Sequence, residues 1–135
     1  MLAQRAGRRW NGGVDLDWRT SIAERRARVE QELTVAAGGA SLCSISRSAG
    51  PVPGVKYLEG RMAALMELER AHRQGMGGTD VATEAHQRWT ERLVGAQQRG
   101  MGADWTAYYA GGVDELAELS APASDRPRQG DSPTQ

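Results

Sequence analysis

The sequence is poor in the residues that usually build or staple a domain. Its 135 residues include no phenylalanine and a single cysteine. Cys43 alone cannot form an intrachain disulfide or a cysteine-built zinc site, which excludes a secreted disulfide scaffold. Leu, Ile and Val together supply 20 of the 135 residues. This share lies below the roughly 20% under which chains tend to lack a packed core. Only the zero net charge argues against a largely unfolded chain. We therefore expect one small domain with a thin core.

Long apolar runs are missing as well. The longest uncharged run, 33–46, has 14 residues and contains Gly38-Gly39, whereas a membrane-spanning helix needs about 18 or more apolar residues. Arg8-Arg9-Trp10 is not followed by the apolar stretch of an export signal. We therefore expect a cytoplasmic protein with no membrane partner. Sixteen arginines against one lysine is typical of a high-GC genome and indicates a bacterial origin.

Charge is unevenly distributed along this neutral chain. Residues 1–28 carry a net charge of +4 and residues 104–120 a net charge of −4. Segments of opposite sign attract each other within one chain or between copies, and salt screens that attraction.

Four stretches have the periodicity of amphipathic helices. In the first, five apolar residues fall within an arc of about 60°, namely Trp18, Ile22, Val29, Leu33 and Ala36. Glycines at 38, 75 and 100 are typical helix ends. The predicted helices are 17–37, 55–74, 80–99 and 104–120. Asp15 or Asp17 is expected to cap the first of them.

Several glycines bear on these helices. Gly60 inside the second is expected to cost up to about 1 kcal/mol relative to alanine. The apolar phase continues across Gly111-Gly112, so we predict one helix over 104–120. The connectors 75–80 and 100–104 resemble each other, which we interpret as two glycine helix ends rather than an internal repeat.

The remaining segments are predicted to be irregular. Residues 38–54 are built from Gly, Ala, Ser and Pro around a single charge, Arg47, which predicts a long loop. Residues 1–13 are expected to form a flexible basic arm and residues 121–135 a disordered tail. The predicted fold is all-α, with a single domain over 14–120. It is a small antiparallel bundle of three to four helices in which consecutive helices joined by short turns are neighbours.

One spacing suggests metal chemistry. Glu69 and His72 form an E-x-x-H pair that lies on one face of a helix, as in carboxylate-bridged dimetal bundles, and His86 is a further candidate ligand. Such a site needs a second E-x-x-H and two more glutamates, but the chain has only two histidines. We therefore predict no metal and no cofactor, and interpret the pair as an interhelical hydrogen bond or ion pair.

Arginines near the N-terminus suggest a nucleic-acid alternative. An arm and helix carrying Arg5, Arg8, Arg9, Arg25 and Arg26 could follow phosphates. The glutamates of the same helix and the neutral chain favour ion pairs on a solvated helix face instead.

No complete catalytic constellation is present. Cys43 has no neighbouring base, and the glycines lack the Gly-Lys-Ser/Thr of a phosphate loop. The leading hypothesis is a non-enzymatic adaptor or regulatory accessory protein that binds a protein partner, or a second copy, through helix faces. The predicted partner-binding residues are Trp18, Arg25, Arg26, Val29 and Leu33, together with the acidic helix 104–120. A DNA-associated protein and a metal-dependent helical enzyme are the alternatives.

Overall fold

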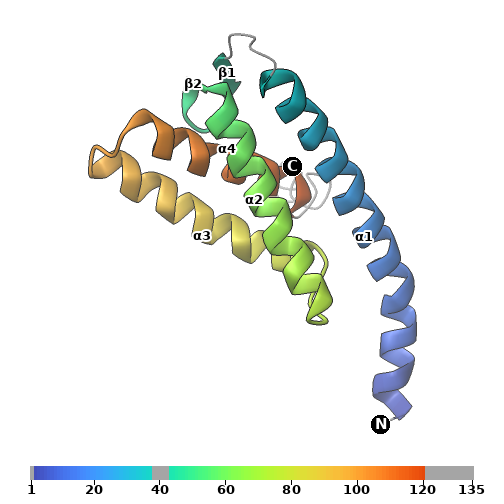
Figure 1. Cartoon of the computed structure of the whole chain (residues 1–135). Helices are drawn as coiled ribbons and strands as arrows, with labels where there is room; N and C mark the ends of the chain where they lie inside the picture. The colour runs from blue at the N-terminus through green and yellow to red at the C-terminus, as the bar shows by residue number, and fades with distance from the viewer. Residues whose placement is uncertain (1, 38–42, 121–135) are drawn as a thin grey trace, which may run out of the picture.

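The structure is a helical bundle with one small β-hairpin (Figure 1). This computed structural model describes the backbone of residues 2–37 and 43–120, and side chains in 17–36, 46–50 and 53–120. The elements are α1 (Leu2–Ala37), β1 (Cys43–Ser46), β2 (Gly50–Pro53), α2 (Gly54–Arg73), α3 (Thr79–Gln98) and α4 (Ala103–Leu119). The all-α prediction is confirmed, and α4 is one helix across its glycine pair. The predicted tail, 121–135, lies outside the described residues.

Helix α1 begins much earlier than the sequence pattern predicted. The prediction placed its start near residue 17 and a flexible arm over 1–13, whereas the helix begins at Leu2. Apart from Gly7, residues 2–9 are Leu, Ala, Gln and Arg, which have high helix propensity, whereas Gly12 and Gly13 disfavour the helix that follows, so propensity accounts for only part of this early start. Asp15 and Asp17 therefore lie inside the helix rather than capping it.

The predicted loop over 38–54 contains regular structure. Strands β1 and β2 pair antiparallel, with Ser44 opposite Val52 and Ser46 opposite Gly50. Gly50 has φ +78°, a left-handed conformation that glycine adopts without strain. Pro51 and Pro53 are tolerated because each strand of a two-stranded ribbon is an edge. Residues 38–42 of the predicted loop lie outside the described part of the chain.

The two similar connectors are equivalent helix ends. After α2, Gly75 has φ +88° and the Met76 amide donates to the Ala71 carbonyl at 2.9 Å. After α3, Gly100 and Met101 repeat this geometry. Both are Schellman motifs, which satisfy the last carbonyls of a helix. The predicted ends of these helices are confirmed to within one residue.

Helix neighbours differ from the simplest antiparallel order. Helix α1 runs antiparallel to α2, and α3 antiparallel to α4 (Figure 1). Sequence analysis also made α2 and α3 neighbours, but α2 packs mainly on α4 and has little backbone contact with α3. Two glycines explain this preference. A Cβ at Gly60 would lie 1.8 Å from the Tyr108 carbonyl oxygen, and one at Gly111 2.0 Å from that of Tyr57. The two backbones therefore touch, and Gly60 is a packing requirement rather than only a propensity cost.

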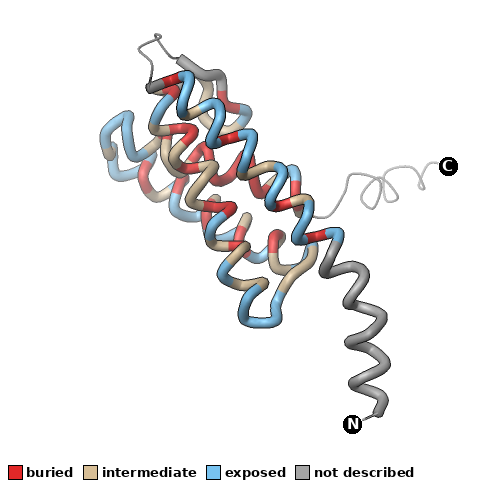
Figure 2. The backbone as a smooth tube through the Cα atoms, turned by 45° about the vertical axis from the view of Figure 1, so that its right-hand side comes forward, coloured by how far each residue is buried: buried red, intermediate tan, exposed pale blue. Residues whose placement is uncertain are grey.

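Buried residues line the inward faces of the helices (Figure 2). Trp89 of α3 occupies the centre, with its ring directly over Gly112, where a Cβ would approach to 2.1 Å. Its Nε1 donates to Glu67 at 3.0 Å. The indole fills space left by small neighbours, since Ala82, Ala85 and Ala96 of the same helix are fully buried.

Candidate functional site

A buried carboxylate, Asp114, holds the hairpin against α4. Its Oδ2 accepts hydrogen bonds from the Tyr57 hydroxyl at 2.6 Å, the Ser46 hydroxyl at 2.8 Å and the Arg47 amide at 3.1 Å. Its Oδ1 accepts from Ser48 at 3.0 Å. Burial and the contact with Asp114 raise the pKa of Tyr57 well above its ordinary value, so this phenol stays protonated and donates. Four donors satisfy the carboxylate, which gives it a structural role.

The next residue, Glu115, connects three helices. Its side chain is fully buried, and its carboxylate accepts from Arg61 of α2 at 2.6 Å and from Arg25 of α1. Burial opposes the charge of Arg25, but hydrogen bonds and attraction from Glu115 and Glu118 outweigh it, so its pKa is raised. Charge-assisted bonds of this kind are roughly twice as strong as neutral ones. This ion pair fixes α1 over α2.

Two of the four acidic residues of α4, which sequence analysis offered as a partner-binding surface, are therefore buried within the chain. Asp114 is 5% and Glu115 0% exposed, whereas Glu118 is partly exposed and binds Arg25 and Arg47. The charge pattern of the sequence does carry a true signal, because Arg25 from the basic segment does meet the acidic segment within one chain. The sequence does not show that the contact of Arg25 with Glu115 is buried, because burial depends on how the helices pack.

The pKa of His86 in α3 depends on burial and on the charge of Asp114. Burial lowers the pKa of His86, and the charge of Asp114 partly opposes that shift. Because the folded pKa lies below the unfolded one, the unfolded state binds more protons as the pH falls through about 6.5, and His86 destabilises the fold there. We expect its NMR titration midpoint to lie below about 6.5 and to fall further in Asp114→Asn. A midpoint unchanged by that substitution would contradict this account.

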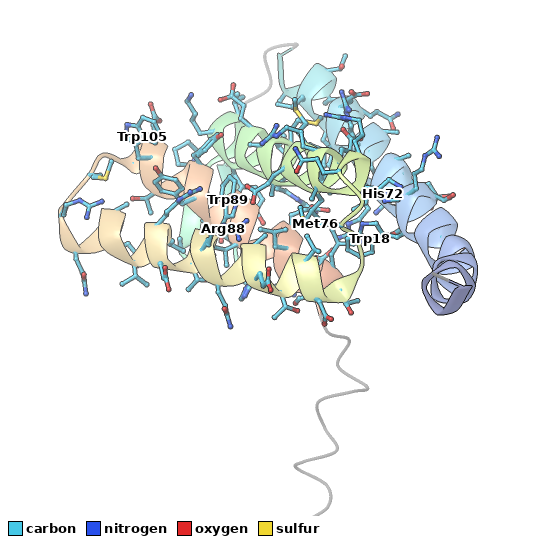
Figure 3. All side chains as sticks on the ribbon, turned by 90° about the horizontal axis from the view of Figure 1, so that it is seen from below. Trp18, His72, Met76, Arg88, Trp89 and Trp105 are labelled. Carbon is cyan, nitrogen blue, oxygen red and sulfur yellow. The ribbon has the colours of Figure 1, made fainter. Side chains whose placement is uncertain are left out.

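A groove of about 510 Å³ lies between α1 and α2. Helix α1 contributes one face and α2 the E-x-x-H face together with the following arginine. The lining residues, which define the basic groove, are Trp18, Arg19, Ile22, Ala23, Arg26, Glu69, His72 and Arg73. Figure 3 shows Trp18, His72 and Met76 together where α1 meets the end of α2, and Trp105 at the far end of the molecule.

Positive charge dominates the basic groove. Three arginines and a histidine face a single carboxylate, Glu69. That carboxylate already accepts from Arg26 at 2.5 Å, and Arg26 also pairs with Glu30. Arg19 and Arg73 form no ion pair with any side chain that the structure describes. Their charges therefore set the local potential and favour an anionic group.

One of the lining residues, Trp18, carries an unsatisfied donor. Trp18 is 8% exposed, and its buried Nε1 has no hydrogen-bond partner among the described residues. The edge of this indole and Nδ1 of His72 both face Gly77: a Cβ there would lie 3.4 Å from Trp18 Nε1 and 3.2 Å from His72 Nδ1. An unpaired buried N–H costs about 1–3 kcal/mol.

The metal candidates are divided between two places. Glu69 and His72 line the basic groove, and Glu69 is engaged by Arg26, as the ion-pair interpretation predicted. His86 lies on α3 and does not line the groove. Within the described residues, no three His, Cys, Asp or Glu side chains form a group that could hold a metal ion.

The predicted partner-binding residues are also divided. Trp18 and Arg26 line the basic groove, whereas Val29 and part of Leu33 pack into the core and Arg25 binds Glu115. The apolar face of α1 that carries Trp18, Ile22 and Val29 is thus covered by other helices of the same chain. Sequence analysis did not single out Arg73 for the site, because its role depends on where α1 lies.

Two of the five nucleic-acid candidates have described side chains, and both form ion pairs within the chain. Arg25 and Arg26 are engaged by carboxylates of α4, α1 and α2. The side chains of Arg5, Arg8 and Arg9 lie outside the described residues.

Another hollow surrounds Trp105, the most exposed of the tryptophans whose side chains the structure describes. Trp105 is 51% exposed and stacks on Tyr109, with centroids 5.8 Å apart. The hollow, about 340 Å³, is lined by Lys56, Asp104, Trp105 and Tyr108. Trp89 belongs to the core and Tyr108 and Tyr109 are partly buried against it, whereas Trp105 is exposed.

Comparison with known proteins adds no relative: no family model, curated protein or solved structure matches the chain. Among the described helices, none combines the length and the apolar character that a bilayer crossing requires.

Proposed function

We propose that this protein is a non-enzymatic interaction protein, an adaptor or regulatory accessory, that binds an acidic segment of a partner protein in the basic groove. The observation that carries the proposal is the groove itself: an open hollow with two arginines, Arg19 and Arg73, that have no ion pair with a described side chain. Charge complementarity of this kind steers association and selects partners.

The apolar part of the groove supports a protein partner. Trp18 and Ile22 form its floor, both mostly buried, and Ala23 leaves space beside them. Buried aromatic and arginine side chains are the groups that dominate protein interfaces. The lining residues include no serine, threonine or cysteine that could act as a nucleophile.

The groove is held in shape by the fold. Arg25 lies next to Arg26 in α1 and is bound to Glu115, so one side of the groove is attached to α4. On the other side, α2 is packed closely on α4 through Gly60. Two walls fixed to the same helix give a preorganised site, which lowers the entropic cost of binding.

Photo-crosslinking tests the proposal. A crosslinkable amino acid replaces Ala23, an exposed residue of the groove lining, and the protein is expressed in its native host. We expect a defined crosslinked protein that disappears in the double variant Arg19→Glu/Arg73→Glu. Purified with this partner, the complex should weaken as salt rises, because the pairing charges are screened.

A matched control lies on the same two helices. Arg28 of α1 and Arg70 of α2 are exposed and do not line the groove, so Arg28→Glu/Arg70→Glu makes the same change in net charge and should leave the crosslink intact. Equal loss in both double variants, a crosslink to a second copy of the chain, or no crosslink at all would each contradict the proposal.

A further inference from the structure

We infer that the basic groove recognises a carboxylate, the side chain of a glutamate or aspartate in the partner segment, and that the Trp18 indole N–H is the donor that orients it. This inference rests on the proposed function and assigns the chemistry of the same site. It makes Trp18 a recognition residue in addition to a core residue.

The first argument is the unpaired donor. Buried polar groups in folded proteins are almost all hydrogen-bonded, and each exception calls for an explanation. Trp18 Nε1 and the hydroxyl of Thr90 are the two buried side-chain polar atoms without a partner in the described structure. A threonine hydroxyl can rotate to a new partner, whereas the indole N–H has a fixed direction. An acceptor supplied by a ligand would satisfy it.

The second argument is the glycine turn over the indole edge. Residue 77 has no side chain, and its backbone covers the gap between Trp18 Nε1 and His72 Nδ1, where a Cβ would lie within 3.4 Å of both nitrogens. The turn is Gly75-Met76-Gly77-Gly78, and its single side chain, Met76, is 51% exposed. Movement of this turn would open both nitrogens to a ligand oxygen without displacing a core side chain.

The third argument is the identity of the surrounding groups. Arg19, Arg73 and His72 favour an anion, and Arg26 is already paired with Glu69. Ile22 and Ala23 provide apolar surface beside them. A carboxylate can accept a hydrogen bond from the indole N–H and also pair with a guanidinium group. An aliphatic residue next to it in the partner segment would cover the apolar wall.

NMR of the indole N–H groups tests this inference directly. The signal of Trp18 is assigned with Trp18→Phe, and the intact protein is titrated with the peptide acetyl-Leu-Glu-Leu-amide. We expect the Trp18 signal to move downfield as the N–H gains an acceptor. The matched peptide acetyl-Leu-Gln-Leu-amide should bind at least about tenfold more weakly, because a hydrogen bond to a charged group contributes about 1.5–3 kcal/mol.

Two alanine variants in equivalent turns sharpen the test. In Gly77→Ala the added methyl lies 3.1 Å from Trp18 Cδ1 and between the two nitrogens, so it should abolish the shift. In Gly102→Ala, in the turn before α4, the methyl meets nothing within 4 Å, and peptide binding should be unchanged. Sodium acetate, as a third probe, should shift the signal weakly, since it lacks the apolar residues.

The outcomes separate this inference from the proposed function. Equal effects of the glutamate and glutamine peptides, or a stationary Trp18 signal, overturn carboxylate recognition even where the crosslink at Ala23 persists and depends on Arg19 and Arg73. Acetate as effective as the peptide would also overturn it, because the site would then take a free organic acid. If the crosslink is lost but the peptide still shifts the Trp18 signal, the proposed protein partner is contradicted and carboxylate recognition is not.

Discussion

Replacing Glu115 with alanine should lower the free energy of unfolding by about 3–5 kcal/mol, the range observed when one partner of a buried ion pair is removed. The carboxylate is fully buried and is the shared partner of Arg25 and Arg61, so its loss leaves two partly buried guanidinium groups without their main acceptor. Because small domains are stable by about 5–15 kcal/mol, the variant should unfold at a much lower urea concentration than the parent protein.

Glu118 provides the control for this measurement. It also pairs with Arg25, but it is about one-third exposed, and exposed pairs contribute about 0–1 kcal/mol. Chemical denaturation followed by circular dichroism should therefore separate Glu115→Ala clearly from Glu118→Ala. Similar losses in the two variants would mean that Glu115 does not carry the connection between the helices.

The second large effect is expected at the crossing of α2 and α4. In Gly111→Ala the new methyl would lie 2.0 Å from the Tyr57 carbonyl oxygen and 3.1 Å from the Arg61 amide nitrogen. Both are backbone atoms, which no rotamer change can move, so the helices must separate. Overpacking commonly costs about 1–3 kcal/mol, and a clash with rigid backbone should cost about 3 kcal/mol or more. Thermal unfolding measures the loss.

Gly95→Ala is the matched control with the opposite sign. This glycine also lies inside a helix, α3, but its added methyl would meet only the end of the Arg99 side chain, at 3.2 Å. That side chain is flexible and can move away. The substitution should therefore stabilise the protein by about 0.5–1 kcal/mol through helix propensity. A stabilising effect of Gly111→Ala would refute the close backbone contact.

Much of the fold could be predicted because it follows from local signals. The ends of α2 and α3 are set by Gly75 and Gly100, which the sequence identifies and the structure uses as left-handed caps. Periodicity placed Trp89 and Leu116 in the core, where they are buried. The extent of α1 was missed because residues 2–16 include three glycines, which argue against a helix. The hairpin was missed because its main anchor, Asp114, is far away in the sequence.

The candidate site could be predicted only in part. The spacing of Glu69 and His72 correctly put them on one helix face, and the α1 pattern correctly grouped Trp18 with Ile22. Neither pattern contains the packing of α1 against α2 that brings these two faces together, because that packing depends on a third helix, whose Glu115 binds both Arg25 and Arg61. For the same reason Asp114 and Glu115 were taken as surface charges, since burial of a charge depends on partners from other helices.

Tyr57 has two roles that limit how this protein can evolve. Its carbonyl oxygen lies against Gly111 and its hydroxyl binds Asp114, so a tyrosine on one helix is matched to a Gly-Gly-x-Asp-Glu stretch on another. Aliphatic positions in such a thin core can exchange one hydrophobic residue for another. Tyr57, Gly111 and Asp114, in contrast, cannot change independently of one another. Distant homologues should accordingly be recognisable by this sparse signature, Tyr57 and Gly60 followed by 111–115, after overall identity has decayed.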